Sequence, residues 1–532
     1  MKFLMNRMAL LFLATSFLSV ACTKNSGRLE YGLDVKETLR INVDQEPPSL
    51  DWHKSSDTTS STITVNTMEG LTKYDLKDPN LNLIPGLATE WTSSKNATVW
   101  TLTPRKGVKW TDGVEFTAQQ VLDGWERLLN PKTASTYSYF LFNVKNAKEY
   151  NEGKITDFSQ VGVKINQAGQ IVVELKSPMS YFPYLLTHHS TYPIRKDVVE
   201  KGGDKWTEPE NIVTLGPYKL IRWDHDKALV LERNEGYYGE KAKTKNVIAY
   251  FINEYSTALN LFNGGKLDFQ HNLPTKELAQ LKNDPGYNSI GILQTYYYGL
   301  NIKKKPFDNL KVRKAFAHAI DRKQVTDLLA AGMIPLSGWI PSGMSYYEPN
   351  IGLNLDVELA NKLLDEAGFK DRSQFPKITI GFNTNENHQR IAENIQSQLK
   401  KNLGIDVQLA NEEWKVYLDR LKTDAPSVFR MGWLADYPDP DNFMSLMTSY
   451  SDNNHTGWKN TAYDKLVEEG AATVDPAKRK AIYAKAQKIL VEEDVPVIPL
   501  YTAVAQFLIS SRVKNFPKTA LDLIELKGVS IE

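Results

Sequence analysis

The sequence predicts an α/β fold with more than one lobe. The chain has 532 residues, well beyond the roughly 250–300 residues at which a single hydrophobic core stops growing. Residues 377–382 and 405–409 are short apolar runs typical of strands, and residues 388–403 between them place apolar side chains on one helical face before a stop at Gly404. Such a β-α-β unit implies two parallel strands joined by a right-handed crossover.

The first 22 residues are typical of an export signal. Lys2 and Arg7 precede a mostly apolar run over residues 8–20, which is shorter than the roughly 20 residues that span a bilayer as a helix. Residues 18–22 (LSVAC) resemble a bacterial lipobox, in which the chain is cleaved before Cys22 and a lipid is attached to the Cys22 thiol. We therefore expect a signal peptide over residues 1–21 and a membrane-anchored lipoprotein of the cell envelope.

Two features leave an alternative open. Ser19 stands where lipoboxes usually have leucine, and the Ser-Val-Ala sequence before Cys22 also fits ordinary signal peptidase. The alternative is a soluble periplasmic protein with an incidental cysteine. Because Cys22 is the only cysteine, an intrachain disulfide and a cysteine-based zinc site are excluded.

The composition is that of an ordinary globular protein. Lys and Arg number 64 against 63 for Asp and Glu, which gives a net charge of +1, so no overall field favours nucleic acid. The sequence has no Gly-x-Ser-x-Gly elbow, no His-Glu-x-x-His helix and no phosphate loop. We expect a protein that is not an enzyme, with no cofactor, no metal and no nucleic-acid partner, and a monomer.

Along the chain, residues 22–37 are polar and predict a tether. Residues 39–43 alternate like a half-buried strand before a turn at residues 46–48. A capping box at Thr117 and Gln120 begins a helix that stops at residues 130–131. Two further capped helices are predicted over residues 356–368 and 475–490, the second with proline at its first position.

Ten short stretches, each weak alone, occur in a characteristic order. They are WTL at 100–102, GVKWTDG at 107–113, FTA at 116–118, ERLLNP at 126–131, TAS at 133–135, GPY at 216–218, LERN at 231–234, VRKAF at 312–316, AIDR at 319–322 and EAGF at 366–369. Together they resemble the dipeptide and oligopeptide solute-binding proteins, extracytoplasmic family 5. The resemblance extends from about residue 39 to the C-terminus.

The resemblance implies a two-lobed periplasmic-binding-protein fold of class II type, with a hinge and an extra third domain. Lobe I is then discontinuous, comprising residues 38–67, 193–293 and 502–532. The extra domain covers residues 68–192 and lobe II covers residues 294–501. The implied function is an extracytoplasmic receptor that closes on short peptides and delivers them to the membrane permease of an ABC importer.

The most informative site segment is RMGWLADYPDP at residues 430–440. A peptide's amino terminus is a cation, and holding it in a desolvated cleft requires a fixed carboxylate. In the family, an aspartate at the position of Asp436 binds this ammonium group, and the backbone of Gly432, Trp433 and Leu434 pairs with the ligand as a neighbouring strand. A turn-capping role for Asp436 is the structural alternative.

Five other residues match family positions. Trp414 and Tyr137 match aromatic pocket residues, and Tyr297 lies in a Tyr-Tyr-Tyr strand that crosses between the lobes. Arg430 and His388 match positions that serve the ligand's carboxylate, although each is equally well explained as a structural partner. Alternation along a strand sends Tyr297 to the face opposite its neighbours, so only part of this triplet can face a ligand.

The sequence departs from the family at one paired position. Enterobacterial relatives have a disulfide where this chain has Gln294 and Leu434, so we expect the loop after Leu434 to be held by packing alone. Receptors of the same fold for nickel, haem or an oligosaccharide are the main alternative, together with a peptide-sensing signalling receptor. The match at Asp436 favours peptides over the other solutes.

Overall fold

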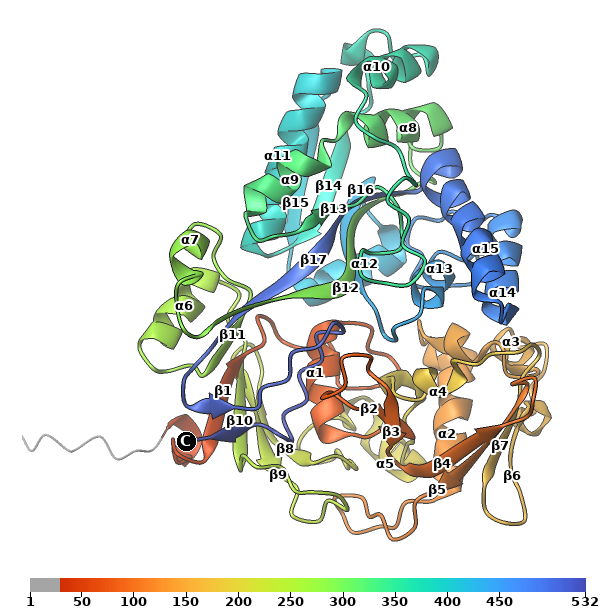
Figure 1. Ribbon diagram of the computed structural model, residues 1–532, viewed down its shortest axis with the longest axis vertical. Helices are drawn as coiled ribbons and strands as arrows, with labels where there is room; N and C mark the ends of the chain where they lie inside the picture. The colour runs from red at the N-terminus through yellow and green to blue at the C-terminus, as the bar shows by residue number, and fades with distance from the viewer. Residues whose placement is uncertain (1–28) are drawn as a thin grey trace, which may run out of the picture.

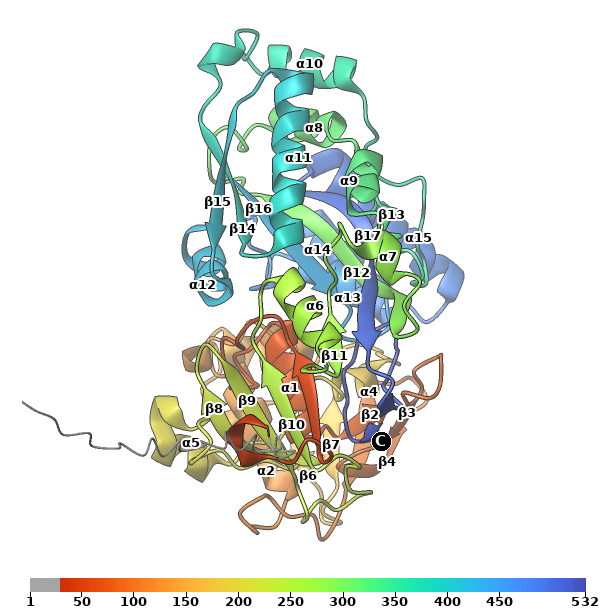
Figure 2. The ribbon, with the colours of Figure 1, turned by 90° about the vertical axis from the view of Figure 1, so that its left-hand side faces the viewer.

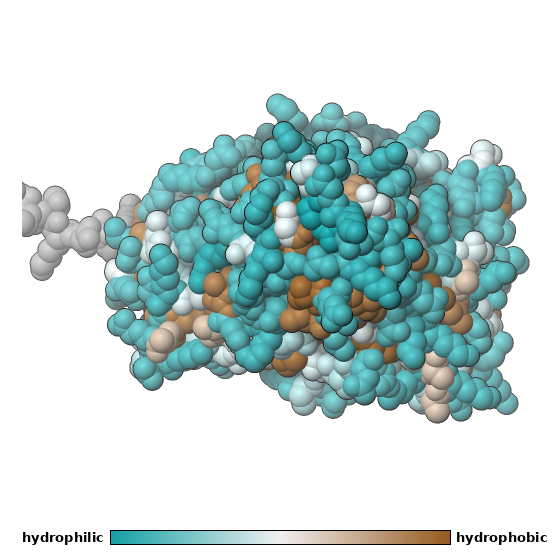
Figure 3. Space-filling view, turned by 90° about the horizontal axis from the view of Figure 1, so that it is seen from above, coloured by the Kyte–Doolittle hydropathy of each residue, from teal (hydrophilic) through white to brown (hydrophobic). Residues whose placement is uncertain are grey.

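The computed structural model describes residues 29–532. Its chain is folded into two lobes, one above the other in Figure 1, with an α/β composition in both. Residues of the middle and late sequence form the upper lobe, whereas the early residues, a middle segment and the C-terminal tail share the lower one (Figure 1). The face seen from above is mostly hydrophilic, with apolar side chains grouped in a few patches (Figure 3).

One large sheet runs through both lobes. Its strand order is β15-β14-β16-β12-β17-β11-β1-β10-β9-β8, and β13 pairs with β17 beside this path. The strands are β1 (Thr38–Asn42), β8 (Tyr218–Asp224), β9 (Ala228–Arg233), β10 (Asn246–Tyr250), β11 (Phe269–His271), β12 (Tyr287–Leu300), β13 (Ile334–Pro335), β14 (Ile378–Asn383), β15 (Val407–Glu412), β16 (Val428–Leu434) and β17 (Val497–Ile509).

Smaller sheets lie in the lower lobe. A four-stranded sheet of order β4-β5-β7-β6 falls inside the range predicted as the extra domain, and β2–β3 and β18–β19 form hairpin-like pairs. These strands are β2 (Thr72–Tyr74), β3 (Leu83–Pro85), β4 (Ala88–Ser93), β5 (Val99–Pro104), β6 (Val163–Ile165), β7 (Ile171–Glu174), β18 (Val513–Lys514) and β19 (Ser530–Ile531).

Helices cover the sheets in both lobes. They are α1 (Thr58–Thr67), α2 (Ala118–Leu129), α3 (Ala147–Asn151), α4 (Phe182–Leu185), α5 (Lys196–Gly202), α6 (Tyr255–Asn263), α7 (Leu278–Leu281), α8 (Leu310–Ala319), α9 (Arg322–Leu329), α10 (Val357–Glu366), α11 (Glu386–Leu403), α12 (Trp414–Asp424), α13 (Asp441–Leu446), α14 (Thr461–Ala472) and α15 (Pro476–Lys488). Short 3-10 turns and a π-helical turn at Ile489–Asp494 complete the described chain.

The predicted β-α-β unit is confirmed. Strands β14 and β15 are parallel neighbours, with Ile378 opposite Val407, and α11 connects them. Helix α11 ends at Gly404, whose positive φ of 71° suits glycine. The helix predicted from the Thr117 capping box is α2, and the two later capped helices are α10 and α15.

Strand β1 differs from its prediction as a half-buried strand. Every residue of β1 is buried, because the strand lies inside the sheet between β10 and β11 and is parallel to both. Its polar residues are satisfied internally: the Arg40 guanidinium donates to both oxygens of Asp268, over 2.9 and 2.7 Å. The polar residues that alternate along β1 therefore do not indicate a solvent-facing side of the strand. One of them, Arg40, belongs to a buried ion pair.

Residues 29–37 of the predicted tether are packed on the lower lobe. Leu29, Tyr31 and Leu33 contact an apolar cluster on β9 and β10, and the guanidinium of Arg222 lies 4.7 Å from the centre of the Tyr31 ring. This part of the segment therefore belongs to the folded domain. The signal peptide, Cys22 and the rest of the tether lie outside the described residues.

The buried ion pair of β1 provides a test of this core. Replacing Arg40 with methionine should lower the free energy of unfolding by up to about 3–5 kcal/mol, because the buried Asp268 then keeps only Arg512, 3.6 Å away, as a charged partner. Denaturant unfolding followed by circular dichroism measures the change. Lys323→Ala, which breaks an ion pair with both side chains mostly exposed, is the matched control. A loss as small as that of the control would contradict this role of Arg40.

Candidate functional site

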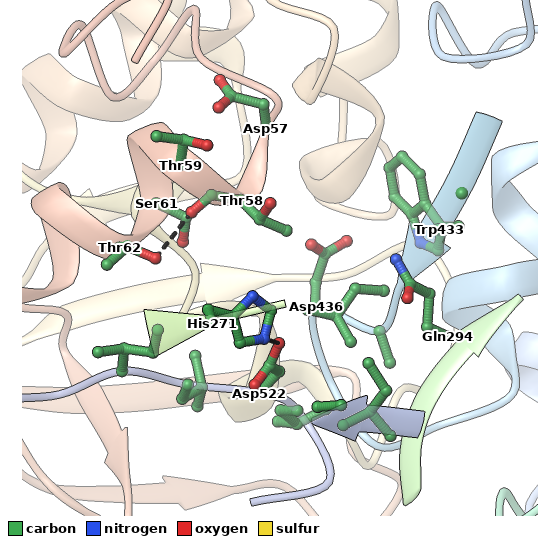
Figure 4. Close-up of a pocket in the computed structure, with 18 of the residues that line it drawn as sticks. Asp57, Thr58, Thr59, Ser61, Thr62, His271, Gln294, Trp433, Asp436 and Asp522 are labelled. Carbon is green, nitrogen blue, oxygen red and sulfur yellow. Dashed lines mark hydrogen bonds and ion pairs between the residues drawn. The ribbon is translucent and has the colours of Figure 1, made fainter. Parts of the chain in front are cut away.

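A cavity of about 360 Å³ lies between the two lobes. The lower lobe contributes the end of β1, the first turns of α1, residues 187–189 and residues 521–525 of the tail. The upper lobe contributes β16 and the start of α11, with α12 and β17 beside them. Figure 4 shows the two sides meeting, with Asp436 projecting into the space between Thr58 of α1 and Trp433 of β16.

Asp436 follows the end of β16 and is contacted by both lobes. Its Oδ1 accepts a hydrogen bond from the Tyr137 hydroxyl at 3.2 Å and lies 3.3 Å from His188 Nε2. Its backbone carbonyl accepts from the Tyr74 hydroxyl at 3.1 Å. The carboxylate side chain is 11% exposed, so it is largely desolvated but still open to the cavity.

The loop that carries Asp436 is fixed by hydrogen bonds, which corrects the expectation that packing alone holds it. Asn442 Oδ1 accepts from the Trp433 indole at 2.9 Å and from the Asp436 N–H at 3.0 Å. Asn442 Nδ2 donates to Asp436 Oδ2 at 2.9 Å. Further along the loop, Asp439 accepts two hydrogen bonds from the Arg479 guanidinium, each 2.7 Å long. Gln294 and Leu434 lie opposite each other on β12 and β16.

Among residues 29–532, strand β16 has one edge that is unpaired beside Asp436. One edge of β16 pairs with β12 along its length, whereas β14 pairs with the other edge only at Val428 and Phe429. Backbone groups of an antiparallel strand alternate between its two edges, and the Ala435 N–H bonds to Leu293 of β12. The backbone groups of Gly432 and Leu434 therefore point to the free edge. The backbone of Trp433 faces β12, which corrects the expectation that it pairs with the ligand.

Aromatic side chains line the cavity near this edge. Trp414, Tyr137 and Trp433 are all cavity residues, and the Tyr137 and Trp433 rings are 6.1 Å apart between centroids. The prediction that Tyr297 lines the binding site is wrong. Its side chain lies on the other face of β12, 4.9 Å from the Trp339 ring and in the core, and its neighbour Tyr296 lines the cavity instead.

Arg430 and His388 lie together in another part of the cavity. The Arg430 guanidinium is 4.7 Å from the centre of the Tyr296 ring and donates to Asn383 at 3.2 Å. Within residues 29–532, no carboxylate comes within 4 Å of it. Burial, and after it the charge of Arg430, hold the pKa of His388 well below its usual range. Of these two residues, Arg430 therefore provides the positive charge.

The residues of one wall of the cavity were not predicted from the sequence. His271 Nε2 lies 3.0 Å from an Asp522 oxygen, as drawn in Figure 4, and Asp44 joins this pair through Asn272. Burial raises the pKa of Asp44 to about 6. Burial alone would lower the pKa of His271, but Asp522 raises it to about 9. The residues are far apart in the chain, so no local motif signals them.

The described part of the chain has neither a metal-binding cluster nor a membrane-spanning helix. Among residues 29–532, no group of three or more His, Cys, Asp and Glu side chains is placed to hold a metal ion. In the same range no helix combines the length and apolar character needed to cross a membrane.

Two lobes closed over a cavity, with a carboxylate beside a free strand edge, define a binding protein of the periplasmic type. The sequence profile of bacterial extracellular solute-binding proteins, family 5 (middle region), matches residues 82–455. The chain is 35% identical to the oligopeptide-binding protein OppA of Bacillus subtilis over 483 residues, which cover 88% of this chain and 87% of OppA. The chain belongs to solute-binding protein family 5.

Solved structures agree with this assignment. Haemophilus influenzae OppA in complex with the peptide RPPGFSPFR has a TM-score of 0.88 and 34% identity, over 94% of this chain and 99% of that one. The murein tripeptide-binding protein MppA of Escherichia coli has a TM-score of 0.89 and 31% identity, over 94% and 99% of the two chains. An unliganded open form of MppA scores only 0.63, at 32% identity and coverages of 94% and 98%. The lobes of this chain are therefore not in that open arrangement.

The His271–Asp522 pair predicts a pH dependence of stability. Because its folded pKa of about 9 exceeds the ordinary 6.5, the pair contributes stability below about pH 6.5 and loses it as the pH rises through about 9. Between these limits the free energy of unfolding should fall by up to about 3 kcal/mol relative to a His271→Gln variant. Denaturant unfolding at about pH 6.5 and about pH 10 measures this. Asp522→Asn should flatten the curve similarly, and equal slopes in all three proteins would contradict the pair.

Proposed function

We propose that this protein is an extracytoplasmic receptor that binds short peptides and delivers them to the membrane permease of an ABC importer. The observation that carries the proposal is the position of Asp436, a mostly buried carboxylate directly beside the free edge of β16. A peptide offers a cationic amino terminus next to a strand-forming backbone, so both features are used by one ligand. The relatives named as oligopeptide-binding proteins support the same class of ligand.

In this proposal the peptide lies extended along β16. Its ammonium group pairs with Asp436, and its backbone bonds to Gly432 and Leu434, which leaves side-chain identity largely free. Trp414, Tyr137 and Trp433 provide apolar walls. The ligand's carboxylate is directed toward Arg430, with His388 as a neutral neighbour. Aromatic walls and backbone bonds accept many side chains, so a broad range of peptides is expected.

The lobes close by a hinge in β12 and β17. The proposed boundaries at residues 293/294 and 501/502 fall inside these two strands, and β12 has register irregularities between Gly291 and Thr295. The proposed lobe I comprises residues 38–67, 193–293 and 502–532, the extra domain residues 68–192, and lobe II residues 294–501. Closure removes water and strengthens the Asp436 ion pair, and the importer then opens the closed form.

Outside the cavity, the protein acts as a monomeric carrier without catalysis, cofactor or nucleic-acid partner. Its place is the cell envelope outside the cytoplasm, where a lipid on Cys22 anchors it to a membrane. The relatives include proteins named as periplasmic, which supports a site of action outside the cytoplasm.

The amine anchor is tested with one peptide in two forms. Asp436→Ala should weaken binding of a free-amine tripeptide by about 2–5 kcal/mol, because one partner of a buried charge pair is lost. N-acetylation of the peptide should weaken binding to the unchanged protein by a similar amount and add little in the variant. Isothermal titration calorimetry measures all four combinations. Equal affinity of the unchanged protein for the free and acetylated peptides would reject the anchor.

The lipid anchor is tested on the mature N-terminus. Mass spectrometry of protein from its native membrane should find residues 1–21 removed and a diacylglycerol on Cys22. Cys22→Ser should release the protein from the membrane fraction without changing its peptide affinity. An unmodified Cys22 in the native protein would establish the soluble alternative.

A further inference from the structure

A histidine of the lower lobe lies against the Asp436 carboxylate. His188 follows α4 and Asp436 follows β16, and Figure 2 shows α4 in the lower lobe and β16 in the upper one. The His188 side chain is 7% exposed, and its ring lies 4.4 Å from that of Tyr137 and 5.0 Å from that of Phe140 between centroids. Its Nε2 is 3.3 Å from Asp436 Oδ1. The closed arrangement therefore brings a packed imidazole onto the carboxylate that is proposed to bind the peptide's amine.

The other nitrogen of this ring is held by the backbone. His188 is the N-cap of the short 3-10 turn His189–Thr191, and its Nδ1 accepts a hydrogen bond from the Ser190 N–H at 3.3 Å. The Ser190 hydroxyl lies 2.8 Å from the same nitrogen. A backbone N–H can only donate, so Nδ1 is unprotonated and the single proton of the neutral imidazole is on Nε2. The nitrogen that carries the proton is therefore the one that faces Asp436.

The groups in contact with the Asp436 carboxylate are uncharged. Its Oδ1 accepts from the Tyr137 hydroxyl and faces His188, and its Oδ2 accepts from the Asn442 amide. Among residues 29–532, no lysine or arginine nitrogen comes within 4 Å of this carboxylate. Burial holds the pKa of the neighbouring His189 well below its usual range, so that ring adds no positive charge. The described part of the chain therefore places no cation at contact distance from Asp436.

One acceptor position of the carboxylate is left for a ligand. A carboxylate offers about four lone-pair positions, and Tyr137, His188 and Asn442 approach three of them, which leaves one on Oδ2. Figure 4 shows Asp436 pointing into the cavity. A cation at the position of His188 would neutralise the carboxylate and compete with a peptide's ammonium group. A neutral donor instead fixes the orientation of the carboxylate and leaves its charge for the ligand.

We propose that His188 is a positioning residue for recognition of the peptide's amino terminus: its tautomer, fixed by the Ser190 N–H, places an uncharged donor beside Asp436 and preserves the carboxylate's charge for the ammonium group. This inference rests on the proposed peptide-binding function. Because His188 and Tyr137 reach Asp436 from the other lobe, the amine site is complete only in the closed arrangement. The contribution of His188 to affinity is therefore specific for ligands with a free amine.

The test compares trialanine with N-acetyl-trialanine at about pH 7, where most of the free amine is charged. Calorimetry measures trialanine directly and the weaker acetylated peptide by competition. His188→Met, which has no donor, should weaken trialanine binding about tenfold, as expected when a hydrogen bond to a charged group is lost, and should leave the acetylated peptide unchanged. His188→Gln, whose amide Nε2 can replace the imidazole N–H, should bind both peptides like the unchanged protein. His318→Met, at a histidine of α8 that does not line the cavity, is the control.

A second measurement needs no variant. Neutron diffraction from a deuterium-exchanged crystal of the trialanine complex locates the ring proton of His188 directly. Deuterium on Nε2 alone is expected, because the Ser190 N–H occupies Nδ1. Deuterium on Nδ1, or on both nitrogens, would overturn the proposal.

The binding data separate this inference from the function on which it rests. Equal weakening of both peptides in His188→Met would show a merely structural role and overturn the proposal. A His188→Gln variant that binds trialanine as weakly as His188→Met does would overturn it as well, since a neutral donor would then not be what matters. If the unchanged protein binds no trialanine, the peptide-binding function itself is rejected, and this inference with it.

Discussion

The backbone pairing between β12 and β17 is the constraint on which the rest of the structure depends. These long strands run side by side from the lower lobe into the upper one, and β12 then pairs with β16 while β17 pairs with β11. Buried N–H and C=O groups must stay paired, so this ladder cannot be broken when the lobes move. Motion is confined to bending, and the register irregularities of β12 are where a strand bends most easily.

The same two strands also decide what faces the cavity. Alternation along β12 sends Tyr296 to the cavity and Tyr297 to the core on the other face. Along β16 it assigns the backbone of Trp433 to β12 and leaves that of Gly432 and Leu434 free. The side chain of Trp433 still serves the site, because its indole is fixed by Asn442. Alternation along the two strands thus determines which residues face the cavity and which residues pack against the rest of the fold.

Carboxylates of the upper lobe accept hydrogen bonds from the lower lobe at two places in the closed structure. Around Asp436, hydroxyl and amide donors from Tyr137 and Asn442 stabilise the carboxylate. At the first turns of α6 and α11, the Tyr255 N–H donates to the Glu386 carboxylate at 3.1 Å. Both contacts join the two lobes in the closed arrangement.

The sequence by itself determined the α/β class, the β-α-β unit of β14, α11 and β15, the capped helices and the family. These follow from local patterns: the period of apolar residues and the chemistry of helix ends act over a few residues. The motif around Asp436 also marked the cavity, since Asp436, Trp414, Tyr137 and Arg430 all line it. The sequence could not predict the full burial of β1, because its Arg40 is neutralised by Asp268 from a distant segment.

Tertiary structure alone decided which distant residues meet. The His271–Asp522 pair joins a strand end to the C-terminal tail, and Glu386 of one lobe caps a helix of the other. Each of these contacts depends on how the chain crosses twice between the lobes. A pattern read along the chain carries no information about such pairings, since the free energy that selects them comes from burial and desolvation in the folded state.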